Sequence, residues 1–436
     1  MLSFLAHYTP LKYFVQSFWR DEAFSYLLAK QDLLQIVVLT ARDFNPPLYY
    51  ILLHFWIQIA GASEIALRSF SLIFFWATIY VVFYILHHCF QLSSKKSFLY
   101  LLLFVGNPLL VYYGSEARMY SMLAFFATAS YYFFLKKNTK AYLIVTVAGL
   151  YTHYFMLFML LAQALVSFIE KKSWKPVALA GIGFVPWVIF LLTQPHAFAQ
   201  QFWIPAISSK NMYELFGTIY TGYEPELDFL KFVFNGVHIF LLAVSIYIGG
   251  LLMWAWKRQK KTYPGDRYAL TAFLLFAIPV VLIVIVSLVK PIYLPRYMIF
   301  STIGLLLFLV LSLERMKFKT RIIFLVGLTV FTVYYQYVQI IFREKADIAI
   351  TISDIKTLAQ PGDRVYVQSD LDFFTVEYYF GEENVYIYHK KYSELPAYIG
   401  KILIPPEKLI NTLPPYPHKA FILAPDGKSY TISSVR

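Results

Sequence analysis

The sequence predicts a polytopic bundle of transmembrane helices that carries a small α/β domain at its C-terminal end. Of its 436 residues, 59% are hydrophobic and only 14% are charged, whereas about a quarter of an average soluble domain is charged. Many apolar runs approach ~20 residues, the length at which a helix crosses a bilayer. These runs stop after Phe342. The composition therefore excludes an ordinary soluble enzyme, a disordered chain and a collagen-like fibre.

The apolar runs predict about ten to eleven membrane spans. They cover residues 64–90, 97–113, 118–135, 140–152, 155–169, 176–194, 231–256, 267–289, 297–313 and 321–341. Basic residues gather in every second connection, at 95–96, 136–140, 171–175, 257–261 and 315–321. Cytoplasmic loops are enriched in Lys and Arg. We therefore expect these connections on the cytoplasmic side of the plasma membrane, and the other connections and the C-terminal domain on the outer side.

Two parts of this pattern allow alternatives. Residues 140–152 and 155–169 are short for spans, and we predict two helices that meet near Thr152 and His153. A single long helix would place the flanking lysine clusters on opposite membrane faces. Residues 1–19 make a poor span: either they lie in the membrane interface, or an upstream span is missing from this sequence, which is the favoured interpretation.

The charge distribution separates two domains, at 1–342 and 343–436. The first carries 27 Lys/Arg and 13 Asp/Glu, whereas the second carries 11 and 12. The basic excess thus belongs to the membrane part, where it sets topology. It does not indicate a nucleic-acid partner. The one cysteine, Cys89, excludes an intrachain disulfide.

The C-terminal domain shows short β-rich segments separated by turn residues. We expect strands at 364–368, 384–388, 419–423 and 429–432 and a helix at 372–380. The segment has no phosphate-binding glycine loop, no metal-ligand spacing and no nucleophile motif. A supporting, docking or acceptor-guiding role is favoured over catalysis.

Two acidic motifs precede the first long span on the expected outer side. Asp21 and Glu22 lie in Trp-Arg-Asp-Glu-Ala. Carboxylates near a bilayer are often functional, and one could act as a general base; acids also favour a helix N-terminus for its dipole. Asp43 and Asn45 precede a double proline that starts a helix, where plain capping is the simpler explanation.

Three further motifs lie at expected outer corners. Glu116 and Arg118 lie between tyrosines and could form a simple ion pair. His153 lies at a helix break and is either a metal ligand or a hydrogen-bonded structural histidine. Arg296 opens a span, where a helix N-terminus and a guanidinium suit a phosphate, although a snorkelling arginine is the alternative.

Together these motifs resemble a known family over roughly residues 15–310. The chain resembles class C fold integral membrane glycosyltransferases that use polyprenyl-phosphate sugars, related to protein O-mannosyltransferases and lipid A aminoarabinose transferases. The matching segments are Trp-Arg-Asp-Glu-Ala at 19–23, Asp-Phe-Asn-Pro-Pro-Leu-Tyr-Tyr at 43–50, Glu-Ala-Arg-Met-Tyr at 116–120, Thr-His-Tyr-Phe at 152–155 and Arg-Tyr at 296–297. Asn45 stands where the family commonly has a histidine.

The resemblance implies a sugar donor on a polyprenyl phosphate and transfer at the outer leaflet to an acceptor in a protein, a lipid or a cell-envelope glycan. It makes Asp21 the catalytic base, with Glu22 as its substitute, and Glu116 a second acid. Arg296 would hold the lipid phosphate. The expected substrate-binding residues are Arg118, Tyr120, Arg296, Tyr297, Asn45 and Tyr50. The resemblance implies no certain cofactor. In the family pattern, Asp43 and His153 are candidate ligands of a divalent metal ion. Asn45 stands in place of the family's histidine, which argues against metal binding here.

The chemistry fits these residue types. Displacement of a lipid phosphate needs a base for the acceptor and a cation for the leaving group, and a single displacement predicts inversion at the anomeric carbon. The loop 195–230, with its tryptophan and tyrosines, is expected to help read the acceptor. The alternative is a transporter or lipid flippase without bond chemistry, which would favour mid-bilayer charges and inverted repeats.

Overall fold

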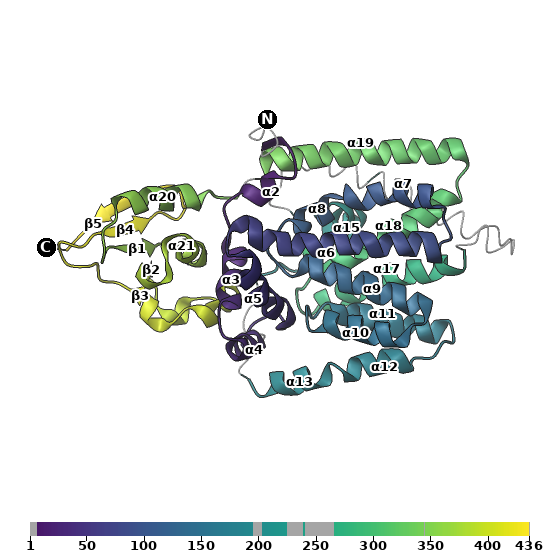
Figure 1. The fold of residues 1–436 in the computed structure, drawn as a ribbon, viewed down its shortest axis with the longest axis horizontal. Helices are drawn as coiled ribbons and strands as arrows, with labels where there is room; N and C mark the ends of the chain where they lie inside the picture. The colour runs from purple at the N-terminus through teal and green to yellow at the C-terminus, as the bar shows by residue number, and fades with distance from the viewer. Residues whose placement is uncertain (1–6, 195–202, 225–238, 240–265, 344, 436) are drawn as a thin grey trace.

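The computed structural model describes residues 7–194, 203–224, 239, 266–343 and 345–435. A bundle of helices and a smaller domain with a β-sheet lie end to end (Figure 1). Within the described residues, five helices are long and apolar enough to cross a membrane, or six if one bent pair forms a single span. The mainly helical class with a small C-terminal sheet is therefore confirmed. The predicted span at 231–256 lies outside the described residues except for residue 239, so the count of ten to eleven spans stays a prediction.

The helices of the bundle differ widely in length. In chain order they are α2 (Lys12–Val15), α3 (Arg20–Ala29), α4 (Leu33–Arg42), α5 (Leu48–Ala60), α6 (Glu64–Tyr84), the π-helical turn η1 (Ile85–Cys89), α7 (Ser94–Val105), α8 (Pro108–Gly114), α9 (Tyr120–Lys136), α10 (Thr139–Leu150), α11 (Met156–Ile169), α12 (Lys175–Ile182), α13 (Val185–Leu192), α14 (Ser209–Tyr213), α15 (Leu215–Thr221), α17 (Asp266–Ser287), the 3-10 turn η4 (Pro295–Met298), α18 (Ile299–Glu314) and α19 (Phe318–Phe342).

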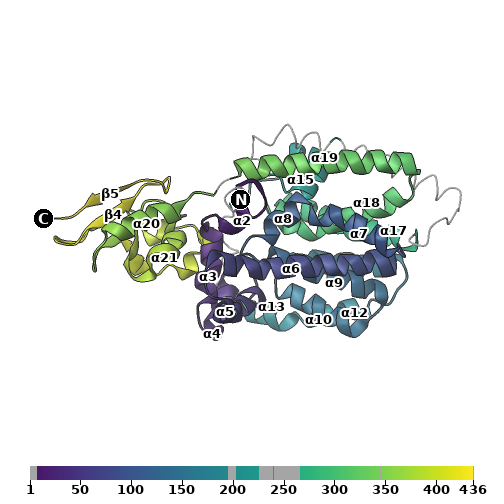
Figure 2. The ribbon, with the colours of Figure 1, turned by 45° about the horizontal axis from the view of Figure 1, so that its top comes forward.

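Burial separates a central helix from peripheral ones. The span Pro295–Glu314, made of η4 and α18, is 89% buried, whereas Lys175–Leu192 is 22% buried and Phe318–Phe342 is 28% buried. Figure 2 shows α19 along the edge of the bundle. A helix that is apolar on every side can be buried among other helices or can face lipid. The central position of this span places its first residues, including Arg296 in η4, among helices.

Two helix breaks position the motifs at 116–120 and 152–155. A bend of 71° separates α7 from α8; the Asn107 side chain accepts from the Leu110 N–H, and Pro108 starts the new helix. The second break lies at 151–155, between α10 and α11. The predicted helix pair is thus confirmed, and the single long helix is excluded. Lys137 and Lys171 line the same pocket, so the lysine clusters on both sides of this pair lie at the same end of the bundle.

The N-terminal segment 7–19 contains the short helix α2 and lies against the end of α19. The Lys12 Nζ donates hydrogen bonds to the carbonyl oxygens of Ile340 and Ile341, at 2.8 and 3.2 Å. These bonds satisfy carbonyls of the last helical turn, which have no partner within the helix. The segment therefore helps to join the bundle to the chain that enters the C-terminal domain.

The C-terminal domain is built on a five-stranded sheet with the order β3-β2-β1-β4-β5. The strands β1, β2, β3 and β4 pair in parallel, and β5 is antiparallel to β4. All four predicted strands and the predicted helix are present; β3 and α20 were not predicted. The elements are α20 (Ile348–Leu358), β1 (Arg364–Val367), α21 (Phe373–Phe380), β2 (Val385–Tyr388), β3 (Leu409–Ile410), β4 (Ala420–Leu423), β5 (Tyr430–Ser433) and the 3-10 turns η5 (Glu382–Asn384), η6 (Tyr392–Glu394), η7 (Ala397–Ile399), η8 (Lys401–Leu403) and η9 (Pro406–Lys408).

The C-terminal domain docks on the bundle through α21. The Tyr378 hydroxyl donates to the Ala62 carbonyl at 2.7 Å, and the Tyr379 hydroxyl donates to Glu64 Oε1 at 2.8 Å. Gly400 has a φ of +90°, and a Cβ there would lie 2.5 Å from the ring of Phe24 in α3. Only glycine permits this backbone conformation and this close approach. The domain is therefore fixed directly beside the acidic motif of α3.

Candidate active site

A cavity of about 750 Å³ lies where the bundle meets the C-terminal domain. Segments far apart in the sequence form its walls: the start of α3, the chain from α8 to 116, residues 203–224, the turn η4, residues 343–348 and the start of α21. Its charged lining residues are Arg20, Glu116, Glu214, Glu224, Arg296, Arg343, Lys345 and Asp372. Its aromatic lining residues are Phe18, Trp19, Tyr112, Tyr113, Trp203, Tyr223, Tyr293 and Tyr398. Aromatic walls with a few convergent polar groups are typical of a ligand site.

Two arginines converge on one carboxylate in this cavity. Arg296 lies in η4, immediately before α18, and Arg343 follows the last residue of α19. Arg296 Nη1 lies 3.6 Å from Glu224 Oε1, and Arg343 Nη2 lies 3.9 Å from Glu224 Oε2. Both distances exceed the roughly 2.7–2.9 Å of a well-formed charge-assisted hydrogen bond. The two guanidiniums thus share a single, loosely held negative charge.

Aromatic rings hold both guanidiniums in place. The Arg343 guanidinium carbon lies 3.7 Å from the centre of the Tyr112 ring, and that of Arg296 lies 5.2 Å from the centre of the Trp203 ring. Both contacts fall within the range of a cation–π interaction. Because a ring supplies no full negative charge, each arginine keeps its ability to bind an anion.

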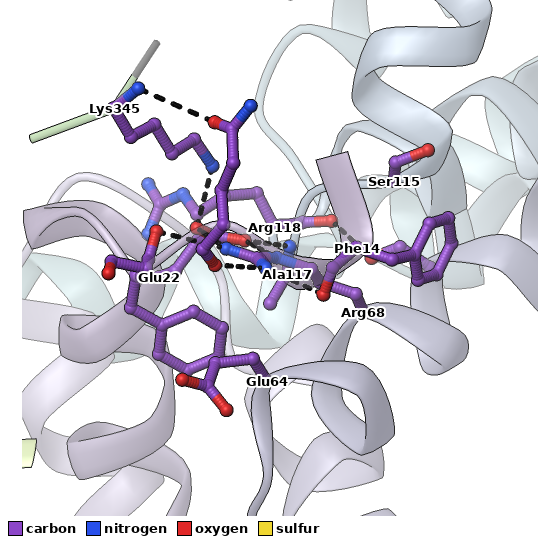
Figure 3. A network of polar contacts seen from close by, with 12 residues as sticks. Phe14, Glu22, Glu64, Arg68, Ser115, Ala117, Arg118 and Lys345 are labelled. Atoms are coloured by element: carbon purple, nitrogen blue, oxygen red, sulfur yellow. Dashed lines mark hydrogen bonds and ion pairs between the residues drawn. The ribbon is translucent and has the colours of Figure 1, made fainter. Parts of the chain in front are cut away.

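Glu22 lies at the centre of a buried network beside the cavity (Figure 3). Its Oε1 accepts from Arg68 Nε at 2.8 Å and from the Ala117 N–H at 3.0 Å, and its Oε2 accepts from Lys345 Nζ at 2.7 Å. Burial alone would raise the pKa of Glu22, but Arg68 and Lys345 lower it to about 2. Every oxygen of this carboxylate is thus bonded, which leaves it no room to act as a base.

Asp21 is held by two guanidiniums. Its Oδ1 accepts from Arg20 Nε at 2.9 Å, and its Oδ2 lies 4.0 Å from Arg118 Nη2. Burial raises the pKa of Asp21, but the charges of Arg20, Arg118 and Arg296 outweigh it and hold the pKa at about 2. Asp21 is therefore ionised at any physiological pH. It is not among the residues that line the cavity.

Glu116 lines the cavity, and its carboxylate, unlike those of Asp21 and Glu22, forms no ion pair or hydrogen bond among the described residues. The residue is 1% exposed, and within the part of the chain that the structure describes neither carboxylate oxygen has a hydrogen-bond partner. Burial raises the pKa of Glu116; Lys345 acts in the opposite direction, and Glu22 raises the pKa further. An unbonded carboxylate of raised pKa in a cavity is typical of a proton acceptor in catalysis.

Arg118 brings the remaining motifs together. Its Nη1 donates to the Asp21 carbonyl at 3.1 Å, and its guanidinium carbon lies 6.0 Å from the centre of the Tyr120 ring. The Tyr120 ring lies 6.0 Å from that of His153 and 6.1 Å from that of Tyr297. The 116–120, 152–155 and 296–297 motifs therefore form one cluster. Tyr50 is fully buried beside Phe24, and Asn45 lies half-buried in the bend between α4 and α5.

Asp43 and His153, the expected metal ligands, are both buried and both feel the charge of Arg118. Burial raises the pKa of Asp43 to about 6, although the Phe44 backbone and Arg118 act against it. Burial, with the charge of Arg118, lowers the pKa of His153 to about 3. A neighbouring guanidinium disfavours a second cation. Among the described residues, no three His, Cys, Asp or Glu side chains gather as a metal-binding group, so we derive no step through a metal.

Sequence reasoning missed Glu224, Arg343, Lys345 and Arg68. The available signal for two of them was position, since Arg343 and Lys345 directly follow the last apolar run. In the expected acceptor loop 195–230, Trp203, Pro205 and Tyr223 line the cavity. Tyr213 is 60% exposed, and Tyr220 is buried, with its hydroxyl 2.6 Å from Thr332 Oγ1. The rest of that loop, 195–202 and 225–230, lies outside the described residues.

Comparison with solved structures identifies the fold. The chain is similar to ArnT from Cupriavidus metallidurans in the apo state, with a TM-score of 0.65, 12% identity and coverage of 98% of this chain and 92% of that one. It is also similar to ArnT bound to undecaprenyl phosphate, with a TM-score of 0.63 and the same identity and coverage. No protein-family model and no curated protein matches the chain. The expected class C fold, that of an aminoarabinose transferase, is therefore confirmed as a fold.

Proposed function

We propose that this chain is a membrane glycosyltransferase that moves a sugar from a polyprenyl-phosphate donor to an acceptor at the outer face of the plasma membrane. One observation carries the proposal: Arg296 and Arg343 share Glu224 in a cavity that Glu116 also lines. Transfer from a lipid phosphate needs cations for the leaving group and a base for the acceptor. This cavity offers both.

The lipid phosphate would bind between the two arginines. The donor is a phosphodiester with one negative charge, as on Glu224, but transfer leaves a phosphate monoester that carries more negative charge, and guanidiniums bind phosphate in a two-pronged geometry. On phosphate binding, the loose contacts of Glu224, at 3.6 and 3.9 Å, are exchanged for closer ones. The fold likeness to ArnT, which has been crystallised with undecaprenyl phosphate, supports the same class of donor.

We assign the general base to Glu116. The family resemblance implies Asp21 as the base, with Glu22 as its substitute and Glu116 as a second acid, whereas the contacts in the structure favour Glu116 as the base. Asp21 is bonded to Arg20 and has a pKa of about 2, so it is a weak base. Glu116 has unbonded oxygens among the described residues, lines the cavity and has a raised pKa. Glu22 is fully bonded, and we assign it a structural role.

The proposed reaction is a single nucleophilic displacement at the anomeric carbon of the donor sugar. The acceptor oxygen or nitrogen attacks the anomeric carbon, its proton passes to Glu116, and the bond from that carbon to the phosphate oxygen breaks. The charge that develops on the phosphate is met by Arg296 and Arg343. One displacement inverts the anomeric carbon. Asp21 would keep Arg118 in place. Of the substrate-binding residues expected from the sequence, Arg296 lines the cavity, whereas Arg118, Tyr120, Tyr297, Asn45 and Tyr50 are not among its lining residues.

The placement of lysines supports an outer active site. The turns from α9 to α10 and from α11 to α12 lie at the end of the bundle opposite the C-terminal domain (Figure 1), and Lys137, Lys171 and Lys172 of these turns line one pocket. Lys96 pairs with Glu314 at 2.6 Å, at the end of α18 that is remote from Arg296. The positive-inside rule then places the lysine-rich end in the cytoplasm. We also propose that residues 1–342 form a transmembrane domain that carries the catalytic loops, and that residues 343–436 form a separate domain on the outer side.

Binding of undecaprenyl phosphate to the purified chain tests the donor assignment. We expect Arg343→Ala to weaken this binding roughly 10- to 100-fold, the value of a charge-assisted hydrogen bond. Arg364→Ala is the matched control, because Arg364 lies 5.2 Å from the Tyr386 ring in a similar stacking contact that is remote from the cavity. Equal affinity of wild type and Arg343→Ala, or equal loss in both variants, would refute the phosphate site.

A further inference from the structure

A second pocket, of about 360 Å³, lies at the end of the bundle opposite the C-terminal domain. The turn between α9 and α10 and the turn between α11 and α12 form it. Lys137, Lys171 and Lys172 line it together with the rings of Phe133 and Phe134. Nothing in the proposed transfer reaction uses this pocket.

The charge of the pocket is weakly compensated. Lys172 pairs with Glu170, and its Nζ lies 5.7 Å from the centre of the Phe134 ring. Among the described residues, neither Lys137 nor Lys171 forms an ion pair with an acidic side chain, and Lys136, Lys140 and Lys175 lie at the helix ends that flank the two turns. The pocket therefore has a strong positive potential over an apolar floor.

The backbone gives a separate reason to regard two of these lysines as selected. Lys137 and Lys171 have φ angles of +56° and +52°. This left-handed conformation at the end of a helix is usually taken by glycine or asparagine, because a Cβ is unfavourable there. Lysine at both positions is strained, although glycine would remove the strain. Both turns therefore carry a lysine at a position where the backbone conformation is unfavourable for a residue with a Cβ.

The pocket lies at the depth of lipid headgroups. Pro176 and Val177 line it, and both belong to the candidate membrane span Lys175–Leu192, which is only 22% buried and therefore faces lipid. Trp174, directly before this span, is 65% exposed. An exposed tryptophan at the end of a span marks the boundary between headgroups and water.

We propose that this pocket binds the phosphate headgroup of an anionic phospholipid. Basic pockets between transmembrane helices are suited to such headgroups. Lys137, Lys171 and Lys172 would contact the phosphate, and the acyl chains would lie along the exposed apolar face of α12 and α13. The proposal does not depend on the glycosyltransferase assignment.

Thermal stability in detergent tests this site in the full chain. Short-chain phosphatidylglycerol should raise the Tm of the wild type at concentrations at which phosphatidylcholine of the same chain length has no effect, because a ligand of the folded state stabilises it. Each lysine near a lipid surface contributes about a factor of five in affinity. The variant Lys137→Gln/Lys171→Gln/Lys172→Gln should therefore bind phosphatidylglycerol roughly 100-fold more weakly.

Matched variants separate the pocket from the general surface charge. The triple variant Lys95→Gln/Lys317→Gln/Lys319→Gln removes three exposed lysines from the same end of the bundle and should bind as the wild type does. Replacement of the three pocket lysines by arginine should preserve binding. If the pocket glutamine variant does not fold, Lys137→Gln and Lys171→Gln alone should each lose about fivefold.

Three results would overturn the proposal. The first is wild-type affinity for phosphatidylglycerol in the pocket variants, and the second is an equal loss in the control triple variant. The third is an equal Tm increase with inorganic phosphate at the same concentration, which would identify a site for soluble anions. Preference for phosphatidylglycerol that is lost only with the pocket lysines supports it.

Discussion

Glu22 and Arg68 form an ion pair in which both side chains are inaccessible to solvent, with Arg68 Nε 2.8 Å from Glu22 Oε1. Arg68 also donates to the carbonyls of Phe14 and Gln16, at 2.9 and 2.6 Å. The pair thus joins α3, α6 and the N-terminal segment, while Lys345 adds the chain that enters the C-terminal domain. We regard it as the frame that holds the acidic motif of α3 beside the cavity.

We expect Glu22→Gln to destabilise the protein strongly. The change leaves two buried cations without their partner, and the loss of one member of a buried pair typically costs about 3–5 kcal/mol. The measurement is the Tm of the purified chain in detergent. Glu407→Gln, on an exposed residue, is the matched control and should leave the Tm nearly unchanged. A Tm equal to that of the wild type in Glu22→Gln would contradict the structural role.

The same pair predicts a pH dependence of stability. The pKa of Glu22 is about 2 in the folded chain, below its ordinary value of 4.5. Its contribution is therefore fully present above about pH 4.5 and is lost as the pH falls toward 2. The Tm of the wild type should fall over this range more than that of Glu22→Gln. Parallel curves for the two proteins would show that other carboxylates cause the acid sensitivity.

Glu224 should compete with the donor phosphate. If the phosphate takes over Arg296 and Arg343, Glu224→Gln removes a competing charge and should tighten undecaprenyl phosphate binding by roughly fivefold, equivalent to ~1 kcal/mol. Arg296→Lys should weaken binding, because an ammonium lacks the two-pronged geometry. Both are measured by titration with undecaprenyl phosphate. Weaker binding in Glu224→Gln would mean that this carboxylate orders the arginines instead.

The acid limb of the pH–rate profile should identify the base. A base must be deprotonated, so turnover falls as the pH drops through its pKa. The raised pKa of Glu116 predicts a fall above pH 4.5, whereas a base with the Asp21 pKa of about 2 would show none in this range. We expect Asp21→Asn to lower turnover and keep the limb. Asp43→Asn is the control variant, because Asp43 is the other carboxyl of this region with a raised pKa, at about 6. If Asp43→Asn removes the acid limb, Asp43 and not Glu116 is the base.

Thiol labelling in intact cells tests the proposed topology. The one native cysteine, Cys89, is buried and should give little background. A cysteine in place of Asp426, in the C-terminal domain, should react with an impermeant reagent, whereas one in place of Lys140 should not. Both positions are exposed in the folded chain. Labelling of the Lys140 site would place the lysine-rich end outside and remove the argument for an outer active site.

Local patterns in the sequence were enough to predict much of the fold. The segments 364–368 and 419–423 combine β-branched or aromatic residues with flanking turns, and both became strands. The lysines at 136–140 and 171–175 predicted a helix pair because charge has to stay on one face, and Lys137 and Lys171 do share a pocket. The strand β3 was missed because two residues are too few to show a period of two.

The environment of the site could not be predicted in this way. Lys345 meets Glu22 across 323 residues of sequence, and no local pattern encodes that contact. The different states of Asp21 and Glu116 also depend on tertiary neighbours, since Arg118 and Arg296 lower the pKa of Asp21, whereas neither carboxylate oxygen of Glu116 has a hydrogen-bond partner among the described residues. Motif order indicated which residues gather, but the choice of base rests on contacts that only the folded chain contains.

The most direct measurement is the release of free polyprenyl phosphate by the purified chain, supplied with a panel of polyprenyl-phosphate sugars and candidate acceptors. We predict release with at least one donor, and a loss of roughly 10²–10⁴-fold in Glu116→Gln, the usual value of general-base assistance. Undecaprenyl phosphate binding should be unchanged in that variant. If the wild type releases no polyprenyl phosphate from any donor but moves these lipids across liposome membranes, the chain is a transporter and the glycosyltransferase account is contradicted.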